Sequence, residues 1–246
     1  MSLHDHLIIP GWPAPPNVKA FQTTRKGGVS TGPYASLNLG GHVGDAPLAV
    51  ARNRSLLSPL LPSDPVWLKQ VHGTVVVDAG AASCHPDGDG CVTSHIGAVC
   101  VVMTADCLPV LLCNENGSVA GAAHAGWRGL CDGVIEQTVH AMKAPPAAMM
   151  AWLGPAIGPQ AFEVGEEVRA AFIAKQPEAV AAFISSPAGN GKWLADIYAL
   201  ARLRLNALGI ERTFGGGLCT YTDRERFFSY RRDGVTGRMG TFIWLG

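Results

Sequence analysis

The sequence has little charge of either sign. Charged residues make up 15% of its 246 residues and the formal net charge is zero, whereas about a quarter of the residues in a typical soluble domain are charged. No overall field therefore attracts nucleic acid or an anionic membrane surface. The composition favours a small substrate that is neutral or recognised locally, and it predicts no nucleic-acid partner and no membrane partner.

Long apolar runs are missing as well. The best segment, AVCVVMTADCLPVLLC at 98–113, contains Asp106 and Pro109, and a membrane span needs about 20 mostly apolar residues. The first residues, MSLHDHLIIPGWPAPP, place acidic and histidine residues where a secretory signal is basic. The sequence therefore predicts a cytoplasmic protein, in which the seven cysteines, an odd number, need not pair.

Repeats, low-complexity segments and long linkers do not occur, so the simplest organisation is one domain over residues 1–246. A Walker or dinucleotide fingerprint is also lacking, because GGG at 215–217 has neither the spacing nor the following lysine or helix. A nucleotide cofactor is therefore not predicted. Hydrophobic residues reach 48% of the chain, which is ample material for a buried core.

The hydrophobic spacing predicts both helices and strands. Helical intervals mark residues 46–61, 130–142 and about 194–208. PVWLKQVHGTVVVD at 65–78 alternates as a strand or hairpin does, with HG at a turn. Apolar runs at 98–103, 108–113 and 119–123 predict three neighbouring buried strands, and TFGGGLCTY, FFSYRR and GTFIWL predict strands near the end of the chain. The irregular order indicates a mixed α/β protein and not a doubly wound sheet.

One cysteine and two of the eight histidines stand out because each lies at the end of a predicted strand. They are Cys107, His72 and His124, and strand ends commonly present functional side chains. Three such ligands, with a fourth position left to water, are typical of catalytic zinc. Their spacing is no compact zinc motif, so a packing role for each remains the simpler interpretation from the pattern alone. The other six histidines lie in the terminus, on a predicted helix or in polar loops.

Two alternatives involve neighbouring residues. Asp106, Cys107 and His124 could form a thiolate nucleophile with a histidine base, and the glycine-rich HAGWRGL could donate N–H groups to an oxyanion or phosphate. A rival metal set lies around CHPDGDGCVTSH, where DGDG is also ordinary turn chemistry. This second set comprises Cys84, Cys91 and His95.

Arginines and aromatic residues complete the candidates. The arginine side chain suits bidentate contacts to phosphate or carboxylate, although a solvated surface role is simpler for any single one. Tyr230 and the phenylalanines before it could stack on a purine, but a core position is the simpler interpretation. The arginines in polar or glycine-containing turns are Arg25, Arg52, Arg54, Arg128, Arg231, Arg232 and Arg238.

Ten motifs, in order and over nearly the whole chain, resemble a known family. They are TTRKGGVS, LNLG, NR, KQVHG, DGCVT, TADCLPVLL, AAHAGWRG, LGPAIGP, FEVG and CTYTDRERFFSYRRDGVTGRMG. The family is known as multicopper polyphenol oxidase or laccase-like, and also as zinc-dependent purine nucleoside phosphorylase and as the bacterial peptidoglycan editing factor. The resemblance implies a single domain of mixed β-sheets flanked by helices, similar to the cytotoxic-necrotizing-factor-like cysteine hydrolase fold.

The resemblance also implies a metal centre and an activity. The histidine of QVHG, the cysteine of TADC and the histidine of AAHAGWRG would hold one zinc, and in this chain they are His72, Cys107 and His124. The implied reactions are phosphorolysis of adenosine, inosine, guanosine and methylthioadenosine, and hydrolytic deamination of adenosine. Purine nucleosides and phosphate are thus the expected partners.

Further residues acquire expected roles from the same resemblance. The arginine associated with activity in the NR region maps to Arg54, with Arg52 as the competing register. We expect Arg54 and Arg25 to bind phosphate, and Asp106 to carry a proton beside the metal. Whether Cys107 only holds the metal or also takes part in bond making stays open.

Alternative functions follow from the same motifs. One is a cysteine- or metal-dependent amidohydrolase that edits a peptidoglycan precursor, and another is a zinc-stabilised binding module without activity. A copper-dependent polyphenol oxidase is weaker, because holding several coppers takes more histidines than the eight present, and the only H-x-H pair is His4 and His6. A His, Cys, His site can still take copper adventitiously. The oligomeric state is left open, and a monomer is compatible with the sequence.

Overall fold

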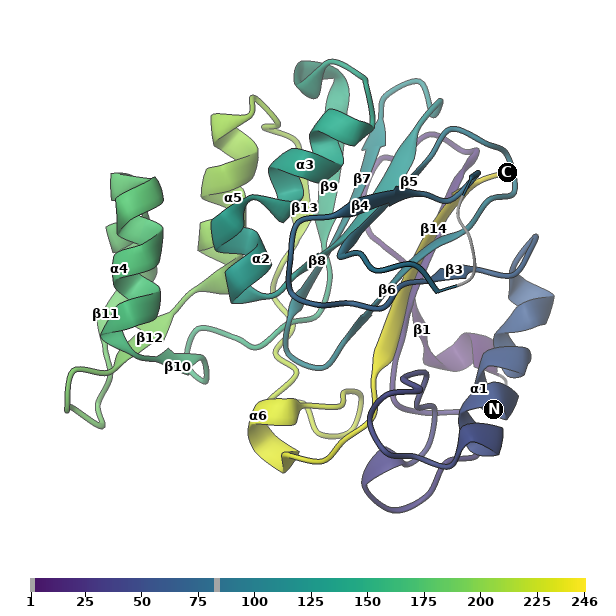
Figure 1. Cartoon of the computed structure of the whole chain (residues 1–246), viewed down its shortest axis with the longest axis horizontal. Coiled ribbons are helices and arrows are strands. Elements are labelled where there is room, and N and C mark those ends of the chain that lie inside the picture. Colours follow the sequence, from purple (N-terminus) through teal and green to yellow (C-terminus); the bar gives the residue numbers. More distant parts are fainter. Residues whose placement is uncertain (1–2, 82–84) are drawn as a thin grey trace.

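Two β-sheets packed face to face form the centre of the fold, which a computed structural model describes over residues 3–81 and 85–246 (Figure 1). The larger sheet has the strand order β13-β9-β7-β8-β5-β4. The pairs β9–β7, β7–β8 and β8–β5 are antiparallel, whereas β13 pairs with β9 and β4 with β5 in parallel. The strands are β4 (Val76–Asp78), β5 (Gly90–Thr93), β7 (Leu108–Asn114), β8 (Ala120–Ala125), β9 (Met149–Leu153) and β13 (Thr213–Gly215).

The second sheet has the order β1-β2-β14-β6-β3 and is antiparallel except for the pairing of β3 with β6. A small third sheet has the order β10-β12-β11. The strands of the second sheet are β1 (Leu7–Ile8), β2 (Val18–Thr23), β3 (Val66–Trp67), β6 (Cys100–Thr104) and β14 (Met239–Leu245). Those of the third are β10 (Glu163–Val164), β11 (Phe183–Ser185) and β12 (Trp193–Ala195).

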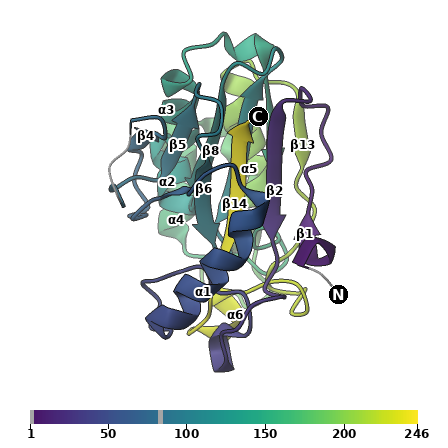
Figure 2. The same cartoon turned by 90° about the vertical axis from the view of Figure 1, so that its right-hand side faces the viewer.

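Helices cover the outer faces of the two large sheets. In Figure 1, α2, α3 and α5 lie against the larger sheet and α4 lies beyond them, while Figure 2 shows α1 across the second sheet. The α-helices are α1 (Pro47–Leu57), α2 (Trp127–Asp132), α3 (Val134–Ala141), α4 (Glu166–Lys175), α5 (Ile197–Ala207) and α6 (Tyr230–Asp233). Short 3-10 helices occupy Leu3–His6, Gly32–Tyr34, Ser58–Leu60, Pro146–Ala148 and Pro177–Ala182.

The hydrophobic core is layered in the same way. Along β7, Leu108, Val110 and Leu112 pack toward the helices, whereas Leu111 and Cys113 pack between the two sheets. Alternate residues of a strand point to opposite faces, so β7 is buried on both sides. Continuous apolar runs, without polar alternation, are typical of such strands.

The mixed α/β class is confirmed, and so is the helix predicted over 46–61, which appears as α1 followed by a 3-10 turn. The helix predicted over 130–142 is interrupted at Gly133, whose φ of 105° is left-handed. The helix expected from residue 194 begins at Ile197, because the side chain of Asp196 accepts hydrogen bonds from the first turn. The single domain and the likeness to the cytotoxic-necrotizing-factor-like fold stay predictions.

Three strand predictions are wrong in part. The runs that become β6, β7 and β8 are all buried strands, but only β7 and β8 pair, and β6 belongs to the facing sheet. Residues 65–78 form no hairpin, because β3 and β4 lie in different sheets. FFSYRR is not a strand either: Phe227 and Phe228 are fully buried, and α6 begins at Tyr230.

Among the described residues, no helix combines the length and the apolar character that a membrane crossing requires.

Candidate metal centre

Three side chains from distant parts of the sequence converge at one end of the layer between the two sheets. One ligand atom each of His72, Cys107 and His124 lies within 4.8 Å of the others. The Sγ of Cys107 is 3.8 Å from Nε2 of His72, and the two imidazole rings meet edge to face with centroids 4.9 Å apart. Tetrahedral zinc with bonds of about 2.1 Å to nitrogen and 2.3 Å to sulfur places these two atoms about 3.6 Å apart. The donor set and its spacing therefore fit zinc.

The register of the larger sheet brings Cys107 to His124. Strands β7 and β8 are antiparallel, with Leu108 opposite Ala125 and Pro109 opposite His124. The residue that precedes β7 consequently lies beside the end of β8. His124 shares the face of β8 that carries Ala120 and Ala122, which pack between the sheets. Both residues thus reach the mouth of the inter-sheet layer.

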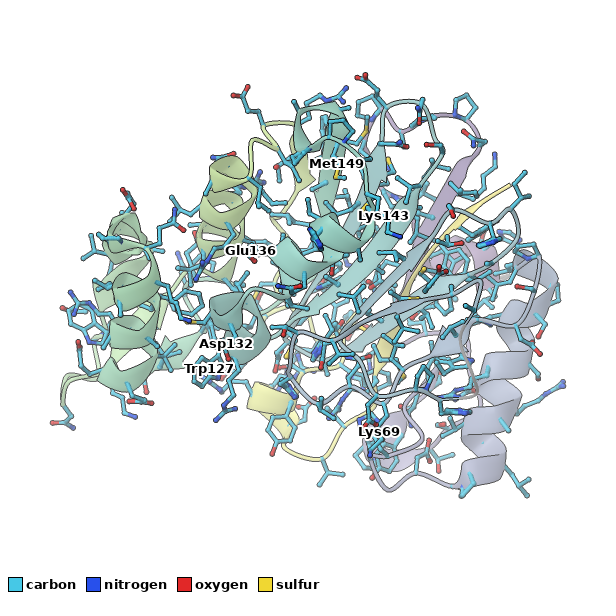
Figure 3. The ribbon with its side chains drawn as sticks, turned by 45° about the horizontal axis from the view of Figure 1, so that its top comes forward. Lys69, Trp127, Asp132, Glu136, Lys143 and Met149 are labelled. Carbon is cyan, nitrogen blue, oxygen red and sulfur yellow. The ribbon has the colours of Figure 1, made fainter. Side chains whose placement is uncertain are left out.

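His72 comes from the loop between β3 and β4, which buried contacts hold in place. It has a left-handed φ of 60°, uncommon for a residue other than glycine. The side chain of Gln70 donates to the carbonyl of Met103 at 2.8 Å and accepts from its N–H at 2.7 Å. These bonds tie the loop to β6. In Figure 3, Lys69 marks the first part of this loop.

Asp89, which is fully buried, organises both histidines. Its carboxylate contacts Nδ1 of His124 at 2.8 Å. The same carboxylate accepts the backbone N–H groups of Val71, His72 and Gly73 at 3.1, 3.0 and 2.7 Å. When Nδ1 of a histidine donates to a carboxylate, Nε2 is left free for a metal. Asp89 therefore fixes the orientation of the His124 ring and the backbone position of the loop that carries His72.

Gly126 allows the three ligands to approach one another. It precedes α2, which carries Trp127 and Asp132 on the helix-covered side of the larger sheet (Figure 3). A Cβ atom at Gly126 would lie 2.8 Å from Cδ2 of His72 and 3.0 Å from Sγ of Cys107. Both distances are too short for carbon, so a side chain at this position would displace the ligands.

The site favours a thiolate paired with an imidazolium when no metal is bound. Burial opposes ionisation of the Cys107 thiol, but His124 and His72 outweigh it and lower the pKa from 9.0 to about 6. Burial likewise opposes protonation of His124, but Cys107 and Asp89 raise its pKa from 6.5 to about 9. A deprotonated sulfur is the form that binds metal or attacks carbon.

A cavity of about 390 Å³ opens beside these ligands. Tyr230 lines this cavity and is 61% exposed, so the core position predicted for this residue is wrong. The buried Oγ1 of Thr104 has no hydrogen-bond partner within the described part of the chain. Besides the three candidate ligands, the lining comprises His42, Gln70, Met103, Thr104, Ala105, Tyr230 and Arg238.

The other residues to which the resemblance gives a role, Asp106, Arg54 and Arg25, do not line this cavity. Asp106 follows β6 with a left-handed φ of 98°, and its carboxylate accepts from Thr220 Oγ1 at 2.6 Å and from the N–H of Arg231 at 2.7 Å. These bonds fix the turn that presents Cys107. The proton-carrier role of Asp106 stays a prediction, and its contacts favour positioning instead.

Arg54 and Arg25 lie at two separate depressions. Both Nε and Nη2 of Arg54 donate to the carbonyl of Leu39, at 3.0 and 2.8 Å, and its guanidinium stacks 3.8 Å above the Trp67 ring. Burial lowers the pKa of Arg54 from 12.5 to about 10. Arg25 donates to the carbonyls of Ala35 and Arg224 and lines a cavity of about 730 Å³.

The rival metal set lies partly outside the described residues and stays a prediction. Cys84 lies outside the described residues. Cys91 is fully buried within β5, and His95 is exposed. In the described ranges, 3–81 and 85–246, the only group of three or more potential ligands is that of His72, Cys107 and His124.

Sequence reasoning overlooked Asp89, Gln70 and His42. Asp89 lies in DGDG, a sequence typical of turns, and His42 lies in a polar loop segment. Gln70 stands in KQVHG, directly beside the valine that precedes His72, so its motif was the available signal. For Asp89 and His42 no local signal existed, since their partners are distant in the sequence.

Comparison with known proteins now decides the family. Residues 19–246 match the family described as multi-copper polyphenol oxidoreductase laccase. The chain belongs to this family. Its relatives include the purine nucleoside phosphorylase YfiH of Escherichia coli, 56% identical over 97% of this chain and 98% of that protein. A purine nucleoside phosphorylase of Pseudomonas aeruginosa is 51% identical over the same shares of the two chains.

Solved structures of the family share the fold. A crystal structure of a Neisseria meningitidis protein has a TM-score of 0.94 and 54% identity, over 98% of this chain and 99% of that one. YlmD from Geobacillus stearothermophilus has a TM-score of 0.83 and 31% identity, over 96% and 94% of the two chains. The names of the curated relatives indicate an enzyme family, and the His, Cys, His cluster is its candidate metal site in this chain.

Proposed function

We propose that the protein is a zinc-dependent purine nucleoside phosphorylase that acts on adenosine, inosine, guanosine and methylthioadenosine, and that it also deaminates adenosine. The observation that carries the proposal is the cluster of His72, Cys107 and His124 beside the 390 Å³ cavity. This volume falls within the range of small-molecule sites, about 300–1,000 Å³. Three protein ligands leave one tetrahedral position open, as in catalytic zinc sites.

The chain's own residues would hold and orient the reactants. His72, Cys107 and His124 are the metal ligands, and Asp89 fixes the two histidines from behind. Zinc, when bound, supplies a Lewis acid for an oxygen atom in its open position. Tyr230 presents an exposed ring at the rim of the cavity, which suits stacking on a purine.

The two proposed reactions differ in their nucleophile. In phosphorolysis an oxygen of HPO₄²⁻ forms a bond to C1′ while the C1′–N9 bond breaks, and the electron pair and the phosphate's hydrogen end on the base. The products are ribose 1-phosphate and the free purine. In deamination water adds at C6 and ammonia departs. Phosphate dependence therefore separates the two activities.

The copper-oxidase description fits this chain less well. The cluster provides one sulfur and two imidazole ligands, and in the described part of the chain no second cluster accompanies it. Several coppers at one centre would need many more ligands than these. The same three-ligand site would still take a single copper, because Cu(II) generally binds nitrogen and sulfur ligands more tightly than Zn(II).

A substrate screen on protein of defined metal content tests the proposal. We expect zinc-loaded protein to release hypoxanthine from inosine only when phosphate is present, and to release ammonia from adenosine without it. If Cys107→Ala retained full zinc content and full activity, the proposal would be wrong. Cleavage of a muramyl amino-acid bond, with no effect of phosphate, would favour the amidohydrolase alternative instead.

A further inference from the structure

Arg238 lines the cavity beside Cys107 with part of its guanidinium unused. Its Nη1 donates to the carbonyls of Thr236 and Gly237, both at 3.0 Å. Among the described residues, the guanidinium donates only through Nη1, and its Cζ lies 5.9 Å from the centre of the Tyr230 ring. Nε and Nη2 are left without a hydrogen-bond partner there. An arginine edge of two N–H donors, held by contacts on its other side, matches two oxygens of a phosphate or carboxylate.

The backbone around Arg238 is fixed by the loop that carries His42. The N–H of Arg238 donates to Oδ1 of Asn38 at 2.8 Å, and the N–H of Leu39 donates to the carbonyl of Arg238 at 3.0 Å. The carbonyl of Leu39 in turn accepts both hydrogen bonds of Arg54. Helix α1, which carries Arg54, thereby anchors the segment on which Arg238 rests.

The stem of Arg238 passes directly over Gly40. A Cβ atom at Gly40 would lie 2.8 Å from Cγ and 3.1 Å from Cβ of Arg238. These are atoms of the fixed part of the side chain, so they cannot move aside without moving the guanidinium. The lack of a side chain at residue 40 lets Arg238 enter the cavity.

One further donor and two acidic groups lie near this edge. His42 lines the same cavity, and burial, followed by the nearby Arg238 and Arg54, lowers its pKa below 6.5. A neutral imidazole can still donate one N–H. Cys107 and Asp106 are the acidic groups that act most strongly on Arg238. The sulfur of Cys107 is a candidate metal ligand, and the carboxylate of Asp106 already accepts from Thr220 and from the N–H of Arg231.

Arg54 and Arg25, the arginines expected to bind phosphate, are less well placed. Both Nε and Nη2 of Arg54 are bound to Leu39, and the residue lines a different depression together with Trp67. Arg25 lines a third cavity, which does not include Cys107. Arg238 is the arginine that lines the cavity of the candidate metal ligands.

We propose that Arg238 binds inorganic phosphate through its Nε and Nη2 edge, with His42 as a second donor, and so holds the nucleophile of the reaction. The inference rests on the proposed phosphorolysis. Phosphate held between Arg238 and the metal ligands would face C1′ of a nucleoside in the same cavity. Arg54 would act through the Leu39 carbonyl as a positioning residue.

The test measures inorganic phosphate directly and in turnover, using zinc-loaded protein. We compare wild type, Arg238→Gln and Arg238→Lys by calorimetric titration with phosphate and by the KM for phosphate at saturating inosine. Arg238→Gln should raise the Kd and the KM for phosphate about tenfold or more, since charge-assisted contacts are lost, and should change the inosine KM less than about twofold. Arg238→Lys should keep only part of the wild-type affinity for phosphate, because lysine has the positive charge but lacks the two-donor edge.

Two further variants keep the result decisive. Gly40→Ala leaves the guanidinium in the sequence but displaces it, and should also raise the phosphate Kd. Arg202→Gln is the matched control, because Arg202 likewise donates to two carbonyls, those of Thr213 and Gly215, beside another cavity. It should leave phosphate binding unchanged.

The outcomes separate this inference from the proposed function. If Arg238→Gln and Gly40→Ala fold, retain zinc and bind phosphate as tightly as wild type, the inference is overturned. If wild type binds phosphate in an Arg238-dependent manner but releases no hypoxanthine, the subsite stands and the proposed phosphorolysis fails. Absence of phosphate binding and of phosphorolysis in wild type would overturn both.

Discussion

Asp89 joins the two candidate histidine ligands through one carboxylate: it contacts Nδ1 of His124 at 2.8 Å and accepts the N–H of His72 at 3.0 Å. The pairing ties a strand residue to a loop residue that lies 52 positions earlier in the chain. Burial would raise the pKa of Asp89, but the hydrogen bonds from His124 and the loop outweigh it and lower the pKa. Asp89 is therefore charged when the ligands are arranged for metal.

Replacing this carboxylate should weaken zinc binding without removing a ligand. For Asp89→Asn we expect the zinc affinity to fall about 10–100-fold, as for other outer-shell partners of metal-binding histidines. Competition with a chromophoric chelator measures the affinity. Asp87→Asn is the control, because Asp87 lies in the same turn as Asp89 but makes an exposed ion pair with Lys69. Equal zinc affinity in Asp89→Asn and wild type would contradict the role assigned to Asp89.

Gly126→Ala should disturb the same centre from the opposite side. The added methyl group would meet Cδ2 of His72 and Sγ of Cys107 at about 3 Å. We expect weaker zinc binding and at least about tenfold lower turnover, because overpacking forces side chains out of position. Gly217→Ala, where a Cβ meets nothing within 4 Å, should behave as wild type. Full zinc affinity in Gly126→Ala would show that the ligands are less crowded than described.

The low pKa of Cys107 predicts its reactivity once metal is removed. A thiol of pKa about 6 is mostly thiolate at pH 7, so alkylation should increase between pH 5 and 7 and then level off. Cys113 is a built-in comparison, because burial raises its pKa to about 12. Mass spectrometry of peptides after iodoacetamide treatment distinguishes the two. Zinc should protect Cys107, and a midpoint near pH 9 would contradict the thiolate–imidazolium pair.

Arg54 should matter for stability as well as for activity. Arg54→Ala removes both hydrogen bonds to Leu39 and the stacking on Trp67, and we expect a loss of about 2 kcal/mol. For a chain of this size that lowers the Tm by about 4–8 °C. Arg52 is exposed on the same helix, so Arg52→Ala should leave the Tm within about 1 °C of wild type. A larger effect at Arg52 would favour the competing register of the NR motif.

The elements that show a local hydrophobic periodicity could be predicted from the sequence. The pairing of strands that lie far apart in the chain could not. The apolar runs around 98–123 identify buried strands, but nothing in them shows that β6 pairs with β14, which begins at Met239. Likewise, FFSYRR has the composition of a strand. In the folded chain Phe227 and Phe228 are buried. The side chain of Ser229 then accepts the N–H of Arg232 and starts a short helix in place of a strand.

In the candidate site, too, local sequence signals could be recognised and contacts between distant residues could not. His72, Cys107 and His124 could be singled out because strand ends flanked by small residues are visible in the sequence. The roles of Asp89 and Arg238 could not be predicted, because they depend on distant residues. The carboxylate of Asp89 contacts His124, 35 positions away, and Arg238 lines the same cavity as Cys107, 131 positions away. Arginines in glycine-containing turns look alike in sequence, and only the folded chain shows which of them lines the cavity of the candidate metal ligands.

The most direct measurement follows activity as metal is restored. Protein stripped of metal should release no hypoxanthine from inosine in phosphate buffer, and activity should rise with added zinc and saturate at one zinc per chain. Cys107→Ala, treated in parallel, should remain inactive at every zinc concentration. Full activity in the metal-free protein, or equal activity of Cys107→Ala and wild type, would contradict a zinc centre built from His72, Cys107 and His124.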